Sequence, residues 1–308
     1  MDALIQSLVQ ANFAPERIAP QASMAQYTTL RIGGPAEVMV NIHSTDEIAV
    51  ALRAAKQADA PVTIIGNGSN LLVRDGGIRG LVLRISGGLN AIRREGDCLL
   101  VQAGASLAAV AAFARDEGLS DMAELGGIPG TVGGGVFMNA GAYDGEMAQV
   151  IDWVDCLDET GAAHRLGKDE LKLGYRTSVF SQLPWSIVGA HLTLATGDET
   201  AIREKMADLA QRRRSKQPLE YPSAGSTFKR PVGHFAGGLI EQCGLKGTKV
   251  GGAQVSEKHA GFVINAGGAT CRDILALIRL VRATVLEQTG VTLEPEVRLL
   301  GCALDEES

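Results

Sequence analysis

Two glycine-rich loops carry the clearest chemical signal in this sequence. The first covers residues 66–73 (GNGSNLLV), and the second covers residues 126–135 (GGIPGTVGGG). Because glycine has no Cβ, its backbone N–H groups can approach a ligand closely, and clusters of such groups cradle pyrophosphates. Tight turns would explain either loop alone, but two such loops in one chain favour a bound dinucleotide.

The first loop differs from the fingerprint of a nicotinamide-binding Rossmann domain. That fingerprint, G-x-G-x-x-G, opens a helix, and here Leu71 stands where its last glycine would be. The sequence therefore disfavours a Rossmann domain.

Candidate charged side chains for binding or catalysis lie near the C-terminus, at His259 and in a run of three arginines. Apolar and charged residues alternate in the segment that we predict as the last strand: Leu293, Val297 and Leu299 with Glu294, Glu296 and Arg298. Glu296 and Arg298 would then share one face, either as a solvated ion pair or as part of a cleft. His259 could face a diphosphate or the edge of a bound dinucleotide, or be an ordinary surface histidine. The arginine run 212–214 is typical of a solvated helix end that could also attract phosphates.

The elements expected around these residues alternate between helices and strands. Ser44 and Glu47 predict a capping box for a helix over 44–60, Ser106 caps a helix closed by Gly118, and Thr270 opens a helix ended by Gly290. A further amphipathic helix contains Ile202, Met206 and Leu209 and stops before Pro218. Strands are expected at 62–65, 81–85, 98–103, 151–157 and 186–194.

Length and composition exclude several classes of protein. A chain of 308 residues suggests two or three domains, with the best boundary at 200–218. The net charge of −6, with scattered basic residues, argues against nucleic-acid binding. The five cysteines have no zinc-site spacing, so we expect no metal and free thiols in a reducing compartment. No segment resembles a signal peptide or a membrane span, so we expect a cytoplasmic protein without a membrane partner.

Six segments in order connect this chain to a known family. They are residues 28–34 (TTLRIGG), 66–73 (GNGSNLLV), 126–143 (GGIPGTVGGGVFMNAGAY), 175–180 (YRTSVF), 224–229 (AGSTFK) and 293–298 (LEPEVR). Together they resemble the UDP-N-acetylenolpyruvoylglucosamine reductase (MurB) family. Each motif is weak alone, but six in the family's order are highly specific.

The resemblance implies an α+β chain with an FAD-binding fold of the vanillyl-alcohol-oxidase type. Its two α+β subdomains would cover residues 1–80 and 81–200, and a C-terminal α+β substrate-binding domain would cover 201–308. The implied activity is that of an NADPH-dependent flavoenzyme that reduces UDP-N-acetylglucosamine enolpyruvate to UDP-N-acetylmuramate for peptidoglycan synthesis. FAD would be bound non-covalently, NADPH would be the reductant, and the protein would be a monomer.

The resemblance also assigns roles to residues. Ser226 matches the family's proton donor, and Arg176 and Glu296 match the residues that stabilise the enediolate formed when hydride reaches the substrate. Tyr175, Lys229 and Arg298 are the expected substrate-binding residues. The expected FAD-binding residues are Thr29, Gly66, Asn67, Gly68, Ser69, Asn70, Leu71, Gly127, Ile128, Pro129, Gly130, Thr131, Gly133, Gly134, Asn139, Ala140 and Gly141.

Two features depart from the family's commonest pattern. Arg230 stands where the family often has asparagine, which puts that substrate contact in doubt. The interval from Arg176 to Ser226 is compact, so the chain resembles the type that lacks a mobile tyrosine loop.

Two other functions stay open at the level of sequence. An oxidase of the same flavin fold would pass electrons to oxygen and would not need Ser226 and Glu296. A catalytically silent nucleotide-binding regulator would need only the glycine loops.

Overall fold

The computed structural model describes residues 1–303, whose contacts divide the chain into two compact units. The first unit comprises residues 1–20, 38–67 and 80–213, and the second comprises 21–37, 68–79 and the chain from Arg214 onward. The chain thus enters the second unit three times. The three-part division at residues 80 and 200 remains a proposal.

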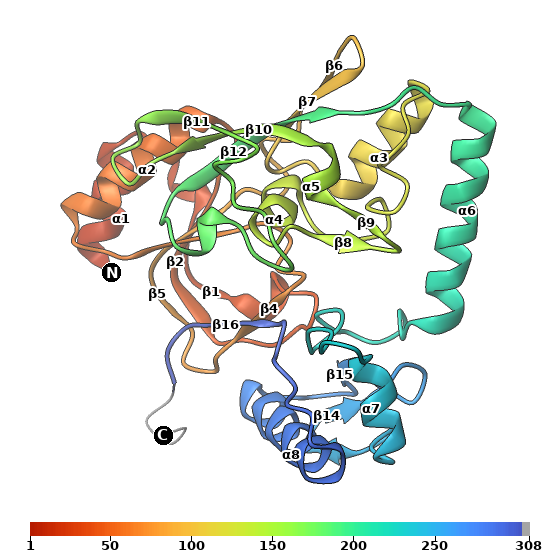
Figure 1. Ribbon diagram of the computed structural model, residues 1–308. Helices are drawn as coiled ribbons and strands as arrows, with labels where there is room; N and C mark the ends of the chain where they lie inside the picture. The colour runs from red at the N-terminus through yellow and green to blue at the C-terminus, as the bar shows by residue number, and fades with distance from the viewer. Residues whose placement is uncertain (304–308) are drawn as a thin grey trace. The chain divides into compact units, whose positions relative to one another are not determined.

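Two sheets have most of their residues in the first unit (Figure 1). Strands β1 (Ile18–Ser23), β2 (Pro35–Asn41), β5 (Ile78–Arg84) and β3 (Val62–Ile65) form the first in this order. Strands β11 (Ala163–Gly167), β10 (Ile151–Leu157), β12 (Ser186–Thr193), β7 (Cys98–Gln102) and β6 (Ile92–Glu95) form the second, and every printed pairing in it is antiparallel. The short hairpin of β8 (Gly141–Ala142) and β9 (Gly145–Glu146) lies apart from both sheets.

Helices complete the first unit. They are α1 (Asp2–Gln10), α2 (Thr45–Gln57), α3 (Leu107–Asp116), α4 (Val132–Phe137), α5 (Met147–Val150) and most of α6 (Glu199–Lys216), with 3₁₀ turns at Pro15–Arg17 and Val179–Ser181. Helix α1 packs on α2, and α4 packs on β12 and β7.

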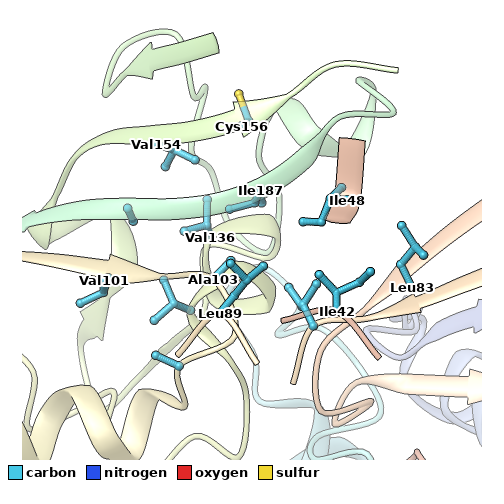
Figure 2. Close-up of a cluster of buried hydrophobic side chains, with 14 of the residues drawn as sticks. Ile42, Ile48, Leu83, Leu89, Val101, Ala103, Val136, Val154, Cys156 and Ile187 are labelled. Carbon is cyan, nitrogen blue, oxygen red and sulfur yellow. The ribbon is translucent and has the colours of Figure 1, made fainter. Parts of the chain in front are cut away.

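Side chains from both sheets and from α4 form one hydrophobic core in this unit. Figure 2 shows Val136 of α4 among Val101, Val154 and Ile187 of the second sheet, with Leu83 of β5 and Ile42, the residue after β2, nearby. Each fully buried side chain of this size contributes about 1.5–3 kcal/mol relative to its exposed state. The core therefore holds the glycine-rich helix α4 in place.

The second unit has its own core. Strands β13 (Lys249–Val250), β14 (Ala253–Val255) and β15 (Val263–Asn265) form a small antiparallel sheet, beside which lie α7 (Ala236–Gln242) and α8 (Cys271–Thr289) (Figure 1). Strand β4 (Leu71–Val73) pairs in parallel with β16 (Arg298–Leu300), and a 3₁₀ turn covers Met24–Gln26. The apolar stripe predicted for α8 is buried in this core.

Most elements predicted from the sequence are confirmed. Ser106 caps α3 by accepting from Ala109 N, Gly118 follows that helix with φ +66°, and α8 has the Thr270–Asp273 capping box and a left-handed Gly290. Strands β3, β7, β10 and β12 match their expected positions within one residue.

The last strand is shorter than predicted. It begins only at Arg298, because Pro295 has no N–H to donate and residues 294–296 instead form isolated bonds with residues 227–229.

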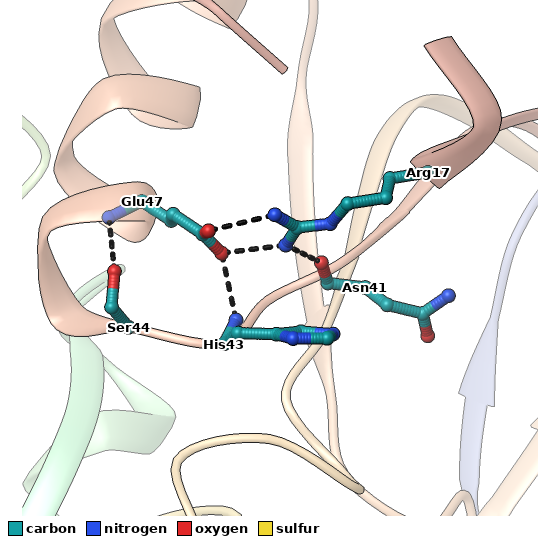
Figure 3. A network of polar contacts seen from close by, with 5 residues as sticks. All are labelled: Arg17, Asn41, His43, Ser44 and Glu47. Atoms are coloured by element: carbon teal, nitrogen blue, oxygen red, sulfur yellow. Dashed lines mark hydrogen bonds and ion pairs between the residues drawn. The ribbon is translucent and has the colours of Figure 1, made fainter. Parts of the chain in front are cut away.

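Only one of the two hydrogen bonds of the capping box predicted for α2 is formed. Ser44 does accept from Glu47 N (3.3 Å), but the Glu47 carboxylate bonds elsewhere (Figure 3). It accepts from His43 N (2.7 Å) and, through both oxygens, from the Arg17 guanidinium (2.8 and 2.7 Å). The hydrogen bonds from Arg17 lower the pKa of Glu47 below its ordinary value near 4.5.

No helix among residues 1–303 is both long and apolar enough to cross a membrane.

Replacing Glu47 with Gln is predicted to destabilise the fold at neutral pH by about 1 kcal/mol, because the Arg17 pair is partly solvent-screened. A lowered pKa means that the carboxylate stabilises the fold above pH 4.5 and loses this effect as the pH falls through its lowered pKa. The difference in melting temperature between wild type and Glu47→Gln should therefore shrink on acidification. Asp46→Asn, which removes an exposed charge from the same helical turn, is the control. A pH-independent difference would contradict this account.

Candidate active site

The two glycine-rich loops meet in the first unit. A Cβ added at Gly66 would lie 2.3 Å from Thr131 Oγ1, so only glycine permits this approach. Asn67 extends the contact, since its Nδ2 donates to Pro129 O (3.4 Å) and its Oδ1 accepts from Ser86 Oγ. The loops that the sequence places apart therefore form one continuous backbone surface.

The second loop is fixed to the segment that leads from β7 into α3. Gly130 O accepts from Leu107 N (3.0 Å), and Gly133 N donates to Ala103 O (2.8 Å). Thr131, only 1% exposed, caps α4 by accepting from Gly134 N (3.4 Å). Gly127, Pro129 and Gly134 are exposed, and Ile128 packs on the core. The loop is thus a rigid support with an open outer backbone.

Arg176 is held beside the end of this glycine-rich region. It lies in a turn closed by reciprocal backbone bonds between Gly174 and Thr177, and its φ of +54° is one that glycine usually adopts. Its Nη2 donates to Gly141 O (2.8 Å), and its guanidinium carbon lies 5.0 Å from the centre of the half-exposed Tyr175 ring. Such backbone strain in a non-glycine residue is typical of functional sites.

Asn139 braces the Arg176 turn. Its Nδ2 donates to Gly174 O (3.0 Å), its Oδ1 accepts from Ala148 N (2.9 Å), and the side chain is buried. The neighbouring Ala140 bonds to Gly135 and Met147 through its backbone. The expected cofactor residues 139–141 therefore connect the glycine loop to Arg176.

The rest of the first loop and Thr29 belong to the second unit. Gly68 has φ +62°, and an added Cβ would lie 2.1 Å from Tyr27 O, so this position also requires glycine. Gly68 O accepts from Thr29 N (3.3 Å), while Thr29 Oγ1 donates to Ser223 O (2.7 Å). Ser69 is half-buried. Thr29 therefore joins the first loop to the segment that carries Ser226.

Ser226 and Glu296 lie on paired segments of the second unit. Glu296 N donates to Thr227 O (2.8 Å), and Lys229 N donates to Glu294 O (2.8 Å). Thr227 is buried and also bonds to Gly261 and Val263, whereas the Ser226 side chain beside it is exposed. The sequence-predicted proton donor is thus an accessible hydroxyl on a fixed backbone.

Asn70 ties the first glycine loop to the same pair of segments. Its Nδ2 donates to Glu296 O (3.3 Å), and its backbone O accepts from Arg298 N (2.9 Å). Leu71 then pairs with Arg298 in the parallel ladder of β4 and β16. Hydrogen bonds therefore connect the first loop to the paired segments that carry Ser226 and Glu296.

The two basic residues that follow Ser226 have partners of their own. The Lys229 ammonium forms an ion pair with the Glu294 carboxylate, and the Arg230 guanidinium lies 4.0 Å from the centre of the exposed Phe235 ring. Lys229, an expected substrate-binding residue, is thus paired with a carboxylate of the protein.

His259 has a structural role. Its Nδ1 accepts from Gly261 N (3.1 Å), its ring packs edge-on against Phe262, and burial lowers its pKa. These contacts favour the reading of a satisfied histidine over that of a diphosphate ligand.

The expectation of a fully solvated arginine run is wrong for Arg213. Arg212 and Arg214 are exposed, but Arg213 is half-buried against Gly127 and over the Tyr143 ring. The signal was present in the sequence, since Arg213 follows Leu209 by four residues and continues the buried face of α6.

One group of potential metal ligands, Cys98, Asp152 and His191, lies on the second sheet, with ligand atoms within 4.8 Å of one another. Cysteine spacing could not reveal it. His191 Nδ1 and Asp152 Oδ2 are hydrogen-bonded to each other (3.0 Å), which accounts for their approach.

Comparisons with known proteins agree with this geometry. A family model of an FAD binding domain matches residues 36–167, and one of the C-terminal domain of UDP-N-acetylenolpyruvoylglucosamine reductase matches residues 217–300. The UDP-N-acetylenolpyruvoylglucosamine reductase of Clostridium perfringens is 48% identical over 286 residues, covering 93% of this chain and 94% of the relative. That of Pediococcus pentosaceus is 47% identical over 296 residues, covering 96% and 98%.

This chain belongs to the UDP-N-acetylenolpyruvoylglucosamine reductase family. The crystal structure of the family member from Thermus caldophilus superposes with a TM-score of 0.79 at 36% identity, covering 91% of this chain and 97% of that one. The expected α+β architecture, an FAD-binding fold of the vanillyl-alcohol-oxidase type followed by a C-terminal domain of this reductase family, is confirmed. The protein is therefore a flavoenzyme of the oxidoreductase class.

The glycine loops fit an FAD. Within the first unit, Gly66 approaches Thr131 more closely than a Cβ would allow, and the backbone of the second loop is exposed at Gly127, Pro129 and Gly134. Such surfaces suit an anionic dinucleotide.

Gly66→Ala is predicted to separate the two loops, because its Cβ would overlap Thr131 Oγ1. Purified protein should contain less flavin and be about 1–3 kcal/mol less stable. In Gly167→Ala, the control, the nearest atom lies at an ordinary 3.5 Å. Wild-type flavin content and melting temperature in Gly66→Ala would refute the prediction.

Proposed function

We propose that this protein reduces UDP-N-acetylglucosamine enolpyruvate to UDP-N-acetylmuramate with electrons from NADPH. Its relatives bear the name of this activity. The observation that carries the proposal is the pairing of the Ser226 and Glu296 segments, which holds an accessible hydroxyl and a carboxyl group on one rigid body.

Reduction of an enol ether conjugated to a carboxylate requires a hydride at one carbon and a proton at its neighbour. Bound FAD would supply the hydride through its N5. Arg176 would bind the substrate carboxylate with two parallel N–H donors, where negative charge accumulates during the reaction. The bond from Nη2 to Gly141 O and the strained turn preorient this guanidinium.

Glu296 and Ser226 would complete the reaction. A protonated or hydrogen-bonding Glu296 stabilises the enediolate, whereas a second negative charge would repel it. Ser226 would then donate its proton to the α-carbon, since its backbone is fixed and its side chain is exposed.

The remaining roles follow the same proposal. Tyr175, Lys229 and Arg298 would bind the substrate. FAD would be held non-covalently by Thr29, by 66–71, by 127–131, by Gly133 and Gly134, and by 139–141. We also propose a cytoplasmic monomer; the free cysteines of residues 1–303 suit a reducing compartment.

The direct test incubates purified protein with NADPH and the enolpyruvyl sugar nucleotide under anaerobic conditions. The proposal expects oxidation of NADPH and a product two hydrogen atoms heavier than the substrate. NADPH oxidation only with oxygen, without this product, would favour an oxidase of the same fold.

Arg176→Lys is predicted to lower turnover about 10²-fold or more, because one ammonium cannot reproduce two parallel donors. Lysine would face the same positive φ, so the substitution isolates the loss of the guanidinium. Steady-state rates with flavin-loaded protein measure the effect, and Arg165→Lys, at an exposed arginine, is the control. Near-normal turnover would make Arg176 a structural residue.

Ser226→Ala is predicted to affect only one half-reaction. Stopped-flow absorbance should show flavin reduction by NADPH at close to the wild-type rate, since this step needs no proton from Ser226. Reoxidation by the substrate should slow about 10²-fold or more, and Ser226→Cys should recover part of the rate because a thiol is more acidic.

Unchanged reoxidation in Ser226→Ala would make Ser226 an ordinary loop residue. Equal loss of both half-reactions would indicate a positioning role without proton donation.

A further inference from the structure

Arg213 is the least expected side chain beside the glycine loops. A Cβ added at Gly127 would lie 2.3 Å from its Nε and 2.9 Å from its Cζ, so the side chain lies flat against the Gly127 backbone. Gly127 must lack a side chain for this arrangement to exist.

Tyr143 supports the guanidinium from another side. The Arg213 Cζ lies 5.3 Å from the centre of the Tyr143 ring, within the range of a cation–π contact. Tyr143 and Asp144 join β8 to β9 with φ values of +50° and +69°. Both central residues of a type I′ turn require positive φ, and Asn-Gly is the usual choice, so Tyr143 is held in a strained position.

The Arg213 guanidinium is charged but has no anionic partner in the part of the chain that the structure describes. Its Nη2 is buried and has no hydrogen-bond acceptor among residues 1–303. Burial is the main cause that lowers the pKa of Arg213, and the opposing contribution comes from the Tyr143 phenol, with no carboxylate among the causes. Burying a charged N–H donor without an acceptor costs free energy. Because the strained Tyr143 nevertheless supports the Arg213 guanidinium in this position, we infer that an anionic acceptor binds there.

We propose that Arg213 is a flavin-binding residue whose Nη2 donates to an anionic group of FAD at the 126–130 loop. The inference rests on the proposed function, because it takes FAD as the ligand. FAD offers two such groups. The diphosphate is charged in both oxidation states, whereas the N1–C2=O edge of the isoalloxazine becomes anionic only on reduction.

The experiment compares Arg213→Gln with Arg212→Gln. Arg212 precedes it on α6, is exposed and pairs with Asp208 (2.7 Å), so its replacement removes the same charge without touching Gly127. For each protein, the dissociation constant of oxidised FAD is measured by reconstituting apoprotein, and the flavin midpoint potential is measured on holoprotein.

A diphosphate contact predicts that Arg213→Gln alone weakens oxidised FAD binding by about tenfold to hundredfold, the loss expected for one charged hydrogen bond. A contact with the reduced ring predicts nearly unchanged binding of oxidised FAD and a more negative midpoint potential. If both quantities match those of Arg212→Gln, the inference is overturned.

A second variant covers the case in which Arg213→Gln fails to fold. Gly127→Ala keeps Arg213 but displaces its side chain. It should therefore change the FAD dissociation constant or the midpoint potential, whichever Arg213 controls, in the direction expected for Arg213→Gln. Wild-type values in folded Gly127→Ala would also overturn the inference. Failure of the proposed function is distinguishable, because FAD binding and the midpoint potential are both measured without the enolpyruvyl sugar nucleotide.

Discussion

The hydrogen bond from Glu296 N to Thr227 O is the constraint on which the chemistry of the second unit depends. Thr227 is itself fixed by Gly261 and Val263, and Asn70 bonds to the Glu296 carbonyl. Any movement of the C-terminal segment would therefore move Ser226, the proposed proton donor, and Asn70 of the first glycine loop as well. A weak acid such as a serine hydroxyl is useful only when it is positioned in this way.

The first unit applies a comparable constraint to the cofactor side. Close approach of Gly66 to Thr131 joins the loops, and the core around Val136 supports them. Asn139 then carries this rigidity to the Arg176 turn. Each unit thus positions some of the candidate site residues. In both units most of the hydrogen bonds that do so involve the backbone, and the closest backbone approaches occur at glycines.

The sequence predicted local structure well. Helix caps at Ser106 and Thr270 were predictable because a side-chain oxygen and a nearby N–H settle them within a few residues. The Glu47 carboxylate was not, because a distant Arg17 competes for it. The last strand begins late because of Pro295, a reason that is visible in the sequence but was outweighed by the alternating pattern.

Long-range relations explain the remaining failures. The burial of Arg213 depends on Gly127, which lies in a loop far away in sequence, and the second unit gathers residues 21–37 and 68–79 with the C-terminal part of the chain. Periodicity within one helix can suggest which face is buried, but not what it meets.

The most direct test of the paired-segment account is a double-mutant cycle on flavin reoxidation by the enolpyruvyl sugar nucleotide, with Ser226→Ala, Glu296→Gln and the double variant. If both groups act in one protonation step on one rigid body, the double variant should be no slower than the slower single variant. Rate losses that multiply in the double variant would contradict the account, because they would show that Ser226 and Glu296 act independently.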